Sequence, residues 1–190
     1  MFIGFYNKAN FITMLGLFLS LASCFLAFSG NINIAIIFLI GAGLCDLFDG
    51  VIARKLKRTE TEKAFGGQLD SLVDVVSFGV APIIISLCNG GNSIYALIIY
   101  ALYLCAVVIR LAYFNSSPQS GNSYQGLPVT YISLVMPILF LFRIPIANIA
   151  MFAIMALLYV VNIRIPKPKG IWYVIFPLIA IAAIVAWCLI

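Results

Sequence analysis

Long apolar stretches limit what this chain can fold into. Of its 190 residues, 64% are hydrophobic and only 9% are charged, whereas a soluble domain has about 25% charged residues. A helix needs roughly 20 apolar residues to cross a bilayer, and seven stretches reach or approach that length. They fall at about residues 10–29, 31–53, 67–88, 93–114, 127–142, 144–163 and 171–190. The pattern predicts a single all-α integral membrane domain over residues 1–190, a polytopic helical bundle of six to seven transmembrane helices.

The basic residues predict how this bundle is oriented. Lys and Arg concentrate in the cytoplasmic loops of membrane proteins. With the N-terminus in the cytoplasm, every one of the 11 basic residues except Arg143 falls on the cytoplasmic side. These residues can also attract the anionic headgroups of a lipid bilayer. Because they gather at membrane borders rather than on a soluble surface, no nucleic-acid partner is expected.

Four of the six acidic residues lie inside apolar stretches, at Asp46, Asp49, Asp70 and Asp74. Ionisable groups at such positions are costly and by default indicate a functional site. Residues three or four positions apart share one face of a helix, so each pair of aspartates lies on one helix face. The two helices are joined on the cytoplasmic side, so they can run antiparallel with the two pairs facing each other.

Such a cluster favours bound divalent cations. Four uncompensated carboxylates would repel one another, and oxygen ligands alone suit Mg²⁺, Mn²⁺ or Ca²⁺. Two ions could clamp the attacking and leaving oxygens of a phosphoryl transfer. Gly50, Ala53 and Gly66 would let phosphates approach the backbone, and Arg54 could hold a diphosphate.

Two other interpretations fit paired acids in a membrane. The aspartates could pair with the basic linker, although its bases lie toward the interface and have Glu60 and Glu62 beside them. Paired acids also mark ion pathways, so a divalent-cation transporter is an alternative. The chain contains no histidine, which excludes histidine nucleophiles and Ser-His-Asp triads.

The spacing around the aspartates resembles the signature of the CDP-alcohol phosphotransferase family. It runs Asp46-x2-Asp49-Gly50-x2-Ala53-Arg54 and then Gly66-x3-Asp70-x3-Asp74. The resemblance implies two Mg²⁺ or Mn²⁺ ions, a homodimer, and a helical core over about residues 10–165, with 171–190 as an extra C-terminal span. It implies metal binding by all four aspartates, with Asp74 also the catalytic general base. CDP contacts are implied for Gly50, Ala53, Arg54, Gly66, Asn10 and Thr13.

The residues that follow resemble one branch of this family, the membrane-embedded phosphatidylserine synthases. They are the run from Gln68 to Pro82, which includes Ser77-Phe78-Gly79, and the element from Arg110 to Asn115. The resemblance implies transfer of the phosphatidyl group from CDP-diacylglycerol to the hydroxyl of L-serine, with release of CMP. It also implies a prokaryotic plasma-membrane protein whose active site faces the cytoplasm. Glycerol-3-phosphate, inositol or inositol phosphate remain alternative acceptors.

Three residues are candidates for contact with the acceptor or a phosphate: Arg110, Asn115 and Lys63. Arg110 offers a planar fork to a carboxylate or a phosphate; alternatively, it is an interfacial topology residue and Asn115 a helix terminator. Asn10 can equally be an ordinary helix cap. The linker from Lys55 to Phe65 is about one helical turn longer than is usual in the family, so the role of Lys63 is open.

Overall fold

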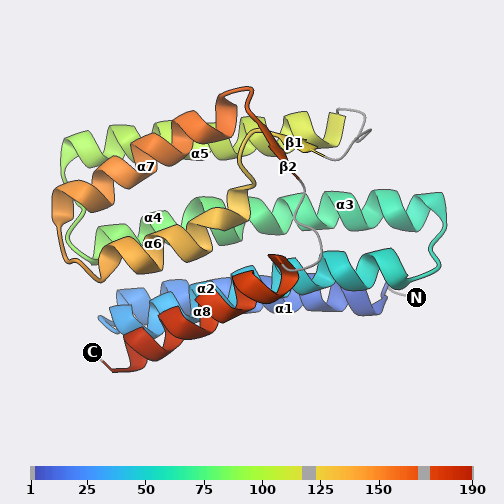
Figure 1. Cartoon of the computed structure of the whole chain (residues 1–190), viewed down its shortest axis with the longest axis horizontal. Helices are drawn as coiled ribbons and strands as arrows, with labels where there is room; N and C mark the ends of the chain where they lie inside the picture. The colour runs from blue at the N-terminus through green and yellow to red at the C-terminus, as the bar shows by residue number, and fades with distance from the viewer. Residues whose placement is uncertain (1–2, 117–122, 167–171, 190) are drawn as a thin grey trace.

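The structure is a bundle of long, roughly aligned helices. The computed structural model describes residues 3–116, 123–166 and 172–189. Figure 1 shows the helices lying side by side along the long axis of the molecule. Their bounds are α1 Lys8–Phe28, α2 Ile32–Lys55, α3 Glu60–Asp74, the π-helix η1 Val75–Val80, α4 Ala81–Cys88, α5 Ile94–Ser116, the short 3-10 helix η2 Val129–Tyr131, α6 Ile132–Phe140, α7 Pro145–Val160 and α8 Trp172–Cys188.

The all-α prediction holds except for one short ribbon. Strands β1 Ser123–Gln125 and β2 Arg164–Pro166 pair antiparallel, with Tyr124 opposite Ile165. Among the described residues, four helical segments are long and apolar enough to cross a membrane: 8–28, 32–55, 60–88 and 94–116. The later apolar helices are shorter, at 129–140, 145–160 and 173–188. The chain is thus a helical membrane protein, while the count of six to seven spans stays a prediction.

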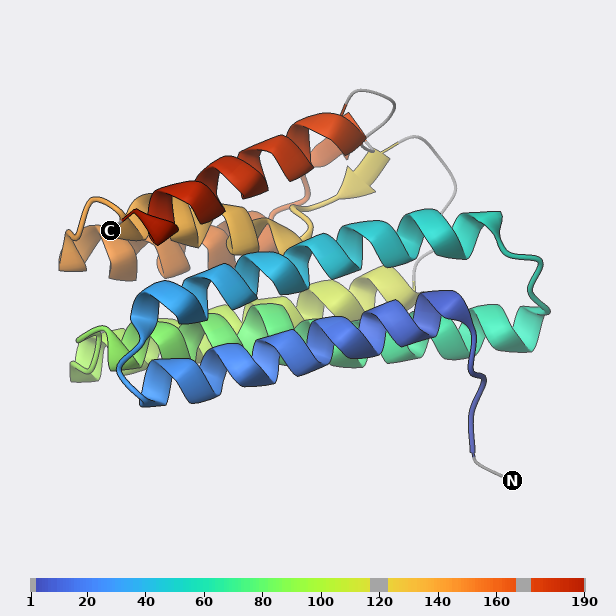
Figure 2. The ribbon, with the colours of Figure 1, turned by 90° about the horizontal axis from the view of Figure 1, so that it is seen from below.

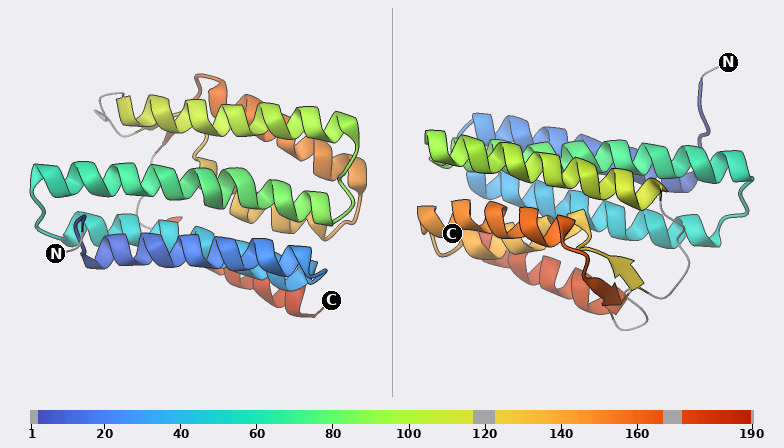
Figure 3. Two further views of the ribbon diagram at one scale, coloured as in Figure 1. Left: turned by 180° about the vertical axis from the view of Figure 1, so that it is seen from behind. Right: turned by 90° about the horizontal axis from the view of Figure 1, so that it is seen from above.

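The helices form two layers. Helices α1, α3–α4 and α5 lie in one layer, as the view from behind shows (Figure 3, left). Helices α6, α7 and α8 lie on the other side, and α2 runs between the two groups (Figure 2). This arrangement puts α2 in contact with α1 on one side and with α6 and α8 on the other. A residue on α2 can therefore face either layer.

Small residues bring the helices close together. A Cβ added at Gly43 of α2 would lie 2.1 Å from the Ser133 hydroxyl of α6, and one at Gly16 of α1 would lie 3.2 Å from the Cβ of Cys45. Close backbone approach through small residues is a common means of helix association in membranes. Between α5 and α7, the rings of Tyr103 and Phe152 pack edge to face with centroids 4.9 Å apart.

Helix α3 begins earlier than the sequence analysis expected. The predicted linker from Lys55 to Phe65 is mostly helical, and only residues 56–59 connect α2 to α3. A capping box explains the start: the Thr59 hydroxyl accepts from the Glu62 amide at 3.3 Å, and the Glu62 carboxylate accepts from the Thr59 amide at 2.8 Å. Such reciprocal bonds satisfy two amides that a helix terminus leaves unpaired. The longer linker is therefore an extension of α3 rather than a longer loop.

One end of the bundle carries most of the described basic residues, and we call it the basic end. The N-terminus, the α2–α3 connection, the end of α5 and the β1–β2 ribbon all lie there, whereas the C-terminus lies at the opposite end (Figures 1 and 3). Arg143 follows α6 at that opposite end. Two of the predicted cytoplasmic bases, Lys167 and Lys169, lie outside the described residues.

Candidate active site

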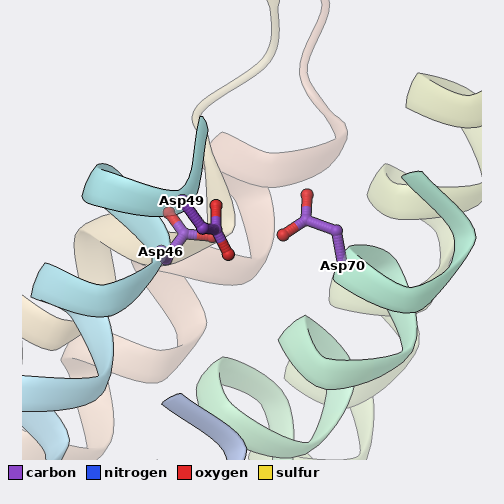
Figure 4. Close-up of side chains that lie close together, drawn as sticks. All are labelled: Asp46, Asp49 and Asp70. Carbon is purple, nitrogen blue, oxygen red and sulfur yellow. The ribbon is translucent and has the colours of Figure 1, made fainter. Parts of the chain in front are cut away.

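Three of the four predicted aspartates meet between α2 and α3. Asp46 and Asp49 project from α2 toward Asp70 on α3 (Figure 4). One carboxylate oxygen from each lies within 4.8 Å of the others. The antiparallel turn between the two helices creates this arrangement, because it makes the two acidic faces oppose each other. The prediction that the pairs face each other is confirmed for these three residues.

Asp74 lies deeper in the same cluster. It lines a small cavity of about 10 Å³ together with Asp46, Asp49 and Asp70. It is 7% exposed, but it is not one of the three residues whose oxygens lie within 4.8 Å of one another. Directly after Asp74 the helix widens into the π-helical turn η1. Such π-helical turns are frequent at functional sites.

The bases of the α2–α3 linker make no ion pair with the aspartates within the described parts of the chain. Lys63 of this linker pairs instead with Glu60 at 2.7 Å, near the start of α3. The alternative in which the basic linker neutralises the aspartates therefore finds no support in these contacts. Buried carboxylates need compensation, and a hard divalent cation suits a site made only of oxygen donors. Asp46, Asp49 and Asp70 together fit such a cation.

Of the two α1 residues that the resemblance implies for CDP contact, Thr13 borders the aspartates. The Thr13 hydroxyl donates to the Asp49 carboxylate at 2.5 Å and to the Ala9 carbonyl at 3.2 Å. Asn10 is 6% exposed, and its side-chain amide donates to the Phe5 carbonyl at 2.8 Å. The N-cap of α1 is Asn7, whose side chain accepts from the Asn10 amide. The alternative reading of Asn10 as the helix cap is therefore wrong.

The predicted CDP-contacting residues lie toward the basic end. Gly50 faces Arg54, because a Cβ at Gly50 would be 3.6 Å from the Arg54 guanidinium. Ala53 lies beside Arg54 in α2. A Cβ at Gly66 would meet the Asn10 side chain at 3.2 Å and the Arg58 guanidinium at 3.1 Å. Gly66 and Asn10 are thus neighbours although α1 and α3 are separate helices.

A larger cavity of about 280 Å³ opens beside the aspartates. Its polar wall includes Asp46, Asp49, Asp70 and Arg54, and its apolar wall comes from α2, α6 and α8. A pocket with acids at one end and apolar side chains at the other suits a ligand that is itself part charged and part hydrocarbon.

Arg110 lies on another side of the same aspartates. It is 5% exposed and donates to the Gly126 carbonyl at 3.5 Å. It lines a cavity of about 140 Å³ that Asp46, Asp70 and Asp74 also line. This burial does not fit an interfacial topology arginine, which would extend its guanidinium into water or headgroups.

The other two acceptor candidates have different surroundings. Asn115 lies in the last turn of α5 and donates to the Ser71 hydroxyl at 2.9 Å, and Ser71 lines the same cavity as Arg110. Lys63 is exposed and paired with Glu60, so the structure does not bring it to the aspartates.

Three residues near the site were not predicted from the sequence. Ser71 follows Asp70 in the chain, and its polarity within an apolar run was the available signal. Arg58 was predicted only to be one of the basic residues at the membrane border, yet its guanidinium lies over Gly66. Tyr173 of α8 accepts a hydrogen bond from Arg54 at 3.0 Å. No local pattern links Tyr173 to a residue so distant in the chain.

The chain is similar to a family of known proteins. The family model described as CDP-alcohol phosphatidyltransferase matches residues 6–187, which include all of α8 except its last residue. A Methanocaldococcus jannaschii protein named CDP-diacylglycerol–serine O-phosphatidyltransferase is 34% identical over 179 residues, which are 93% of this chain and 83% of that protein. A Methanothermobacter thermautotrophicus protein named archaetidylserine synthase is 29% identical over 170 residues, 87% of this chain and 72% of that protein.

Bacterial relatives match over a shorter region. A Helicobacter pylori protein, also named CDP-diacylglycerol–serine O-phosphatidyltransferase, is 34% identical over 128 residues. The match covers 65% of this chain and 53% of that protein. The chain thus spans about half the length of this relative.

Proposed function

Because this chain belongs to the CDP-alcohol phosphatidyltransferase family, we propose that it transfers the phosphatidyl group of CDP-diacylglycerol to the hydroxyl of L-serine. The products are phosphatidylserine and CMP. The observation that carries the proposal is the set of facing aspartates between two cavities, one part apolar and one lined by Arg110. Such an arrangement can hold a lipid-linked donor and a small acceptor on two sides of the same carboxylates.

We place the donor in the larger cavity. Its hydrocarbon part would lie along the apolar wall, and its diphosphate would lie near Arg54 and the carboxylates of Asp46, Asp49 and Asp70. Cytidine would extend toward Asn10 and Gly66, where the missing Cβ of Gly66 leaves room for close approach. The donor would enter laterally from the inner leaflet.

The carboxylates would hold one or two divalent cations, Mg²⁺ or Mn²⁺. Bound there, the ions would neutralise the diphosphate and stabilise the charge that develops in phosphoryl transfer. The Thr13 hydroxyl would fix the orientation of Asp49 through its hydrogen bond. At metal sites a hydrogen bond to a ligand commonly fixes how that ligand is oriented toward the ion.

Asp74 would act as the general base. Its carboxylate takes the proton from the serine hydroxyl as the serine oxygen bonds to the lipid-linked phosphorus. The bond from that phosphorus to the bridging oxygen breaks, and CMP leaves with that oxygen. Asp74 lines the cavity that Arg110 also lines, so an acceptor held there can reach it. Arg110 would bind the serine carboxylate through its planar fork.

The acceptor assay tests this function. Purified protein in detergent–lipid micelles is given CDP-diacylglycerol, Mg²⁺ or Mn²⁺, and separately L-serine, glycerol-3-phosphate, inositol, inositol phosphate or ethanolamine. We expect CMP release with L-serine and a product with the mass of phosphatidylserine. CMP release with another acceptor alone would reassign the substrate, and no CMP release with any acceptor would leave the cation-transporter alternative.

The lipid backbone is tested in the same assay. One relative is named for archaetidylserine and another for phosphatidylserine, so a CDP-activated archaeal ether lipid is the matched second donor. The faster donor at equal concentration identifies the backbone that the larger cavity prefers. We also propose a homodimer on the family resemblance, and the mass of the purified protein–detergent complex tests it.

A further inference from the structure

One contact joins the candidate site to the last helix. The Arg54 guanidinium of α2 donates to the Tyr173 hydroxyl of α8 at 3.0 Å. The carbon of the same guanidinium lies 5.7 Å from the centre of the Tyr173 ring. Tyr173 therefore holds the Arg54 guanidinium through both a hydrogen bond and a cation–π contact.

Helix α8 also forms a wall of the larger cavity. Tyr173, Phe176 and Ala180 line it together with Asp46 and Asp49. Its lining residues thus come from both α8 and the aspartate-bearing part of α2. A helix that had only a membrane-anchoring role would not need to supply this wall.

Contacts at both ends of α8 fix it against α6 and against the short helix η2 that precedes α6. Near the basic end, the rings of Tyr131 and Phe176 pack edge to face with centroids 5.4 Å apart. Near the opposite end, the indole of Trp187 donates to the Pro137 carbonyl at 3.1 Å. Trp187 is 5% exposed, so α8 is packed along its length rather than attached at one point. Tyr173 therefore has a fixed place relative to the site.

Holding Arg54 has a consequence for binding. A free arginine side chain has many rotamers, and it loses part of that conformational entropy when it binds an anion. If the guanidinium is already held at the cavity mouth, the ligand does not bear this cost. The tyrosine hydroxyl occupies only part of the donor fork, since arginine has five N–H donors. The remaining donors stay available for a phosphate.

We propose that Tyr173 is a positioning residue that holds the Arg54 guanidinium toward the donor diphosphate, so that α8 is part of the donor-binding site. This rests on the proposed function only in taking the donor to be a CDP-activated lipid. Tyr173 acts through Arg54 and not on the acceptor. Loss of the Tyr173 side chain should therefore weaken binding of the donor and leave binding of the acceptor unchanged.

The test is steady-state kinetics of Tyr173→Phe and Tyr173→Leu, with KM measured separately for CDP-diacylglycerol and serine. Tyr173→Phe keeps the ring and loses the hydrogen bond, so we expect the donor KM to rise about threefold. Tyr173→Leu loses both contacts, so we expect about tenfold. The kcat and the serine KM should not change. The matched control is Tyr95→Leu, an exposed tyrosine at the start of α5 near the opposite end, which should leave both KM values unchanged.

A double-mutant cycle separates positioning from simple structural support. In an Arg54→Lys background, Tyr173→Leu should add little to the donor KM, because the group it positions is gone. Three results would overturn the proposal. The donor KM could be unchanged in both Tyr173 variants, or Tyr173→Leu could raise the donor KM as much in the Arg54→Lys background as in the wild type. The third is an equal rise of the donor KM and the serine KM. If Tyr173→Leu fails to fold, Tyr173→Phe in both backgrounds decides the outcome. A wild-type protein that releases no CMP would instead refute the proposed function.

Discussion

Asp74 differs from the other three aspartates in its surroundings. Asp46, Asp49 and Asp70 bring carboxylate oxygens within 4.8 Å of one another, and Asp74 lies beside them. Asp74 lines the cavity that contains Arg110, as Asp46 and Asp70 do, but of the four aspartates it alone does not line the larger cavity. This geometry lets one carboxylate serve the acceptor while the other three hold the donor side. The proposed division between base and ligands follows from that placement.

Asp74→Asn tests the proposed base. The amide is nearly the same size but accepts a proton far less readily, so we expect kcat to fall about 10²–10⁴-fold. Binding of the CDP-lipid, measured by equilibrium dialysis with the labelled lipid in micelles, should persist. Glu60→Gln is the matched control, since this exposed acid lies away from the site and pairs only with Lys63. A folded Asp74→Asn protein with wild-type kcat would remove Asp74 from this role.

Arg110→Lys tests the proposed acceptor contact. Lysine keeps the charge but loses the planar fork that matches a carboxylate. We expect the serine KM to rise about tenfold, the value of roughly one charged hydrogen bond, and the donor KM to change little. Arg143→Lys at the opposite end is the control and should leave both values unchanged. Equal changes in the two KM values after Arg110→Lys would point to a structural role instead.

Helices α2 and α6 touch at a position where only glycine fits. A Cβ at Gly43 would lie 2.1 Å from the Ser133 hydroxyl, which itself donates to the Thr130 carbonyl at 2.7 Å. Gly43 and Ser133 both line the larger cavity. The spacing of these helices therefore sets the shape of the proposed donor site as well as the packing.

Gly43→Ala should destabilise the protein by about 1–3 kcal/mol, as overpacking of a close contact does. Thermal unfolding in detergent, followed by circular dichroism, measures the shift. Gly67→Ala is the control, because a Cβ there meets nothing within 4 Å and alanine favours a helix interior by about 0.8–1 kcal/mol. A Gly43→Ala protein as stable as Gly67→Ala would show that α2 and α6 are not in close contact.

Local sequence patterns explain why some elements could be predicted and others could not. Helical periodicity was enough to place Asp46, Asp49 and Asp70 on facing surfaces. The start of α3 was missed because residues 55–65 are rich in charge and resemble a loop, although Thr59-x2-Glu62 is a capping-box pattern. The contact between Arg54 and Tyr173 depends on how α8 packs against α2, which no local spacing encodes.

The whole molecule has one strongly basic end, and Asp46, Asp49 and Asp70 lie nearer to that end of α2 and of the helical segment 60–88. Positive loops face the cytoplasm, so the proposed site would open to the side where serine and CMP are found. Within the part of the chain that the structure describes, four helical segments are long enough to cross the bilayer. The shorter α6, α7 and α8 pack against them (Figure 2).

Cysteine labelling tests this orientation. In a background with the five native cysteines replaced, Lys57→Cys and Arg143→Cys place single thiols at the basic and opposite ends. We expect a membrane-impermeant maleimide to label Arg143→Cys in right-side-out vesicles and Lys57→Cys only in inverted ones. The reverse labelling pattern would show that the molecule has the opposite orientation in the membrane. Labelling of both variants from one side would place both loops on that side.

One measurement tests most directly whether the facing aspartates perform this chemistry. It compares serine-dependent CMP release by the wild type and by Asp70→Asn at several divalent-cation concentrations. The wild type should release CMP and form phosphatidylserine in equal amounts, lose activity when a chelator is added, and recover it with Mg²⁺ or Mn²⁺. Asp70→Asn, folded to the same extent, should be at least about a hundredfold slower in kcat. Wild-type turnover that persists without divalent cations, or an Asp70→Asn protein with undiminished kcat, would contradict the account.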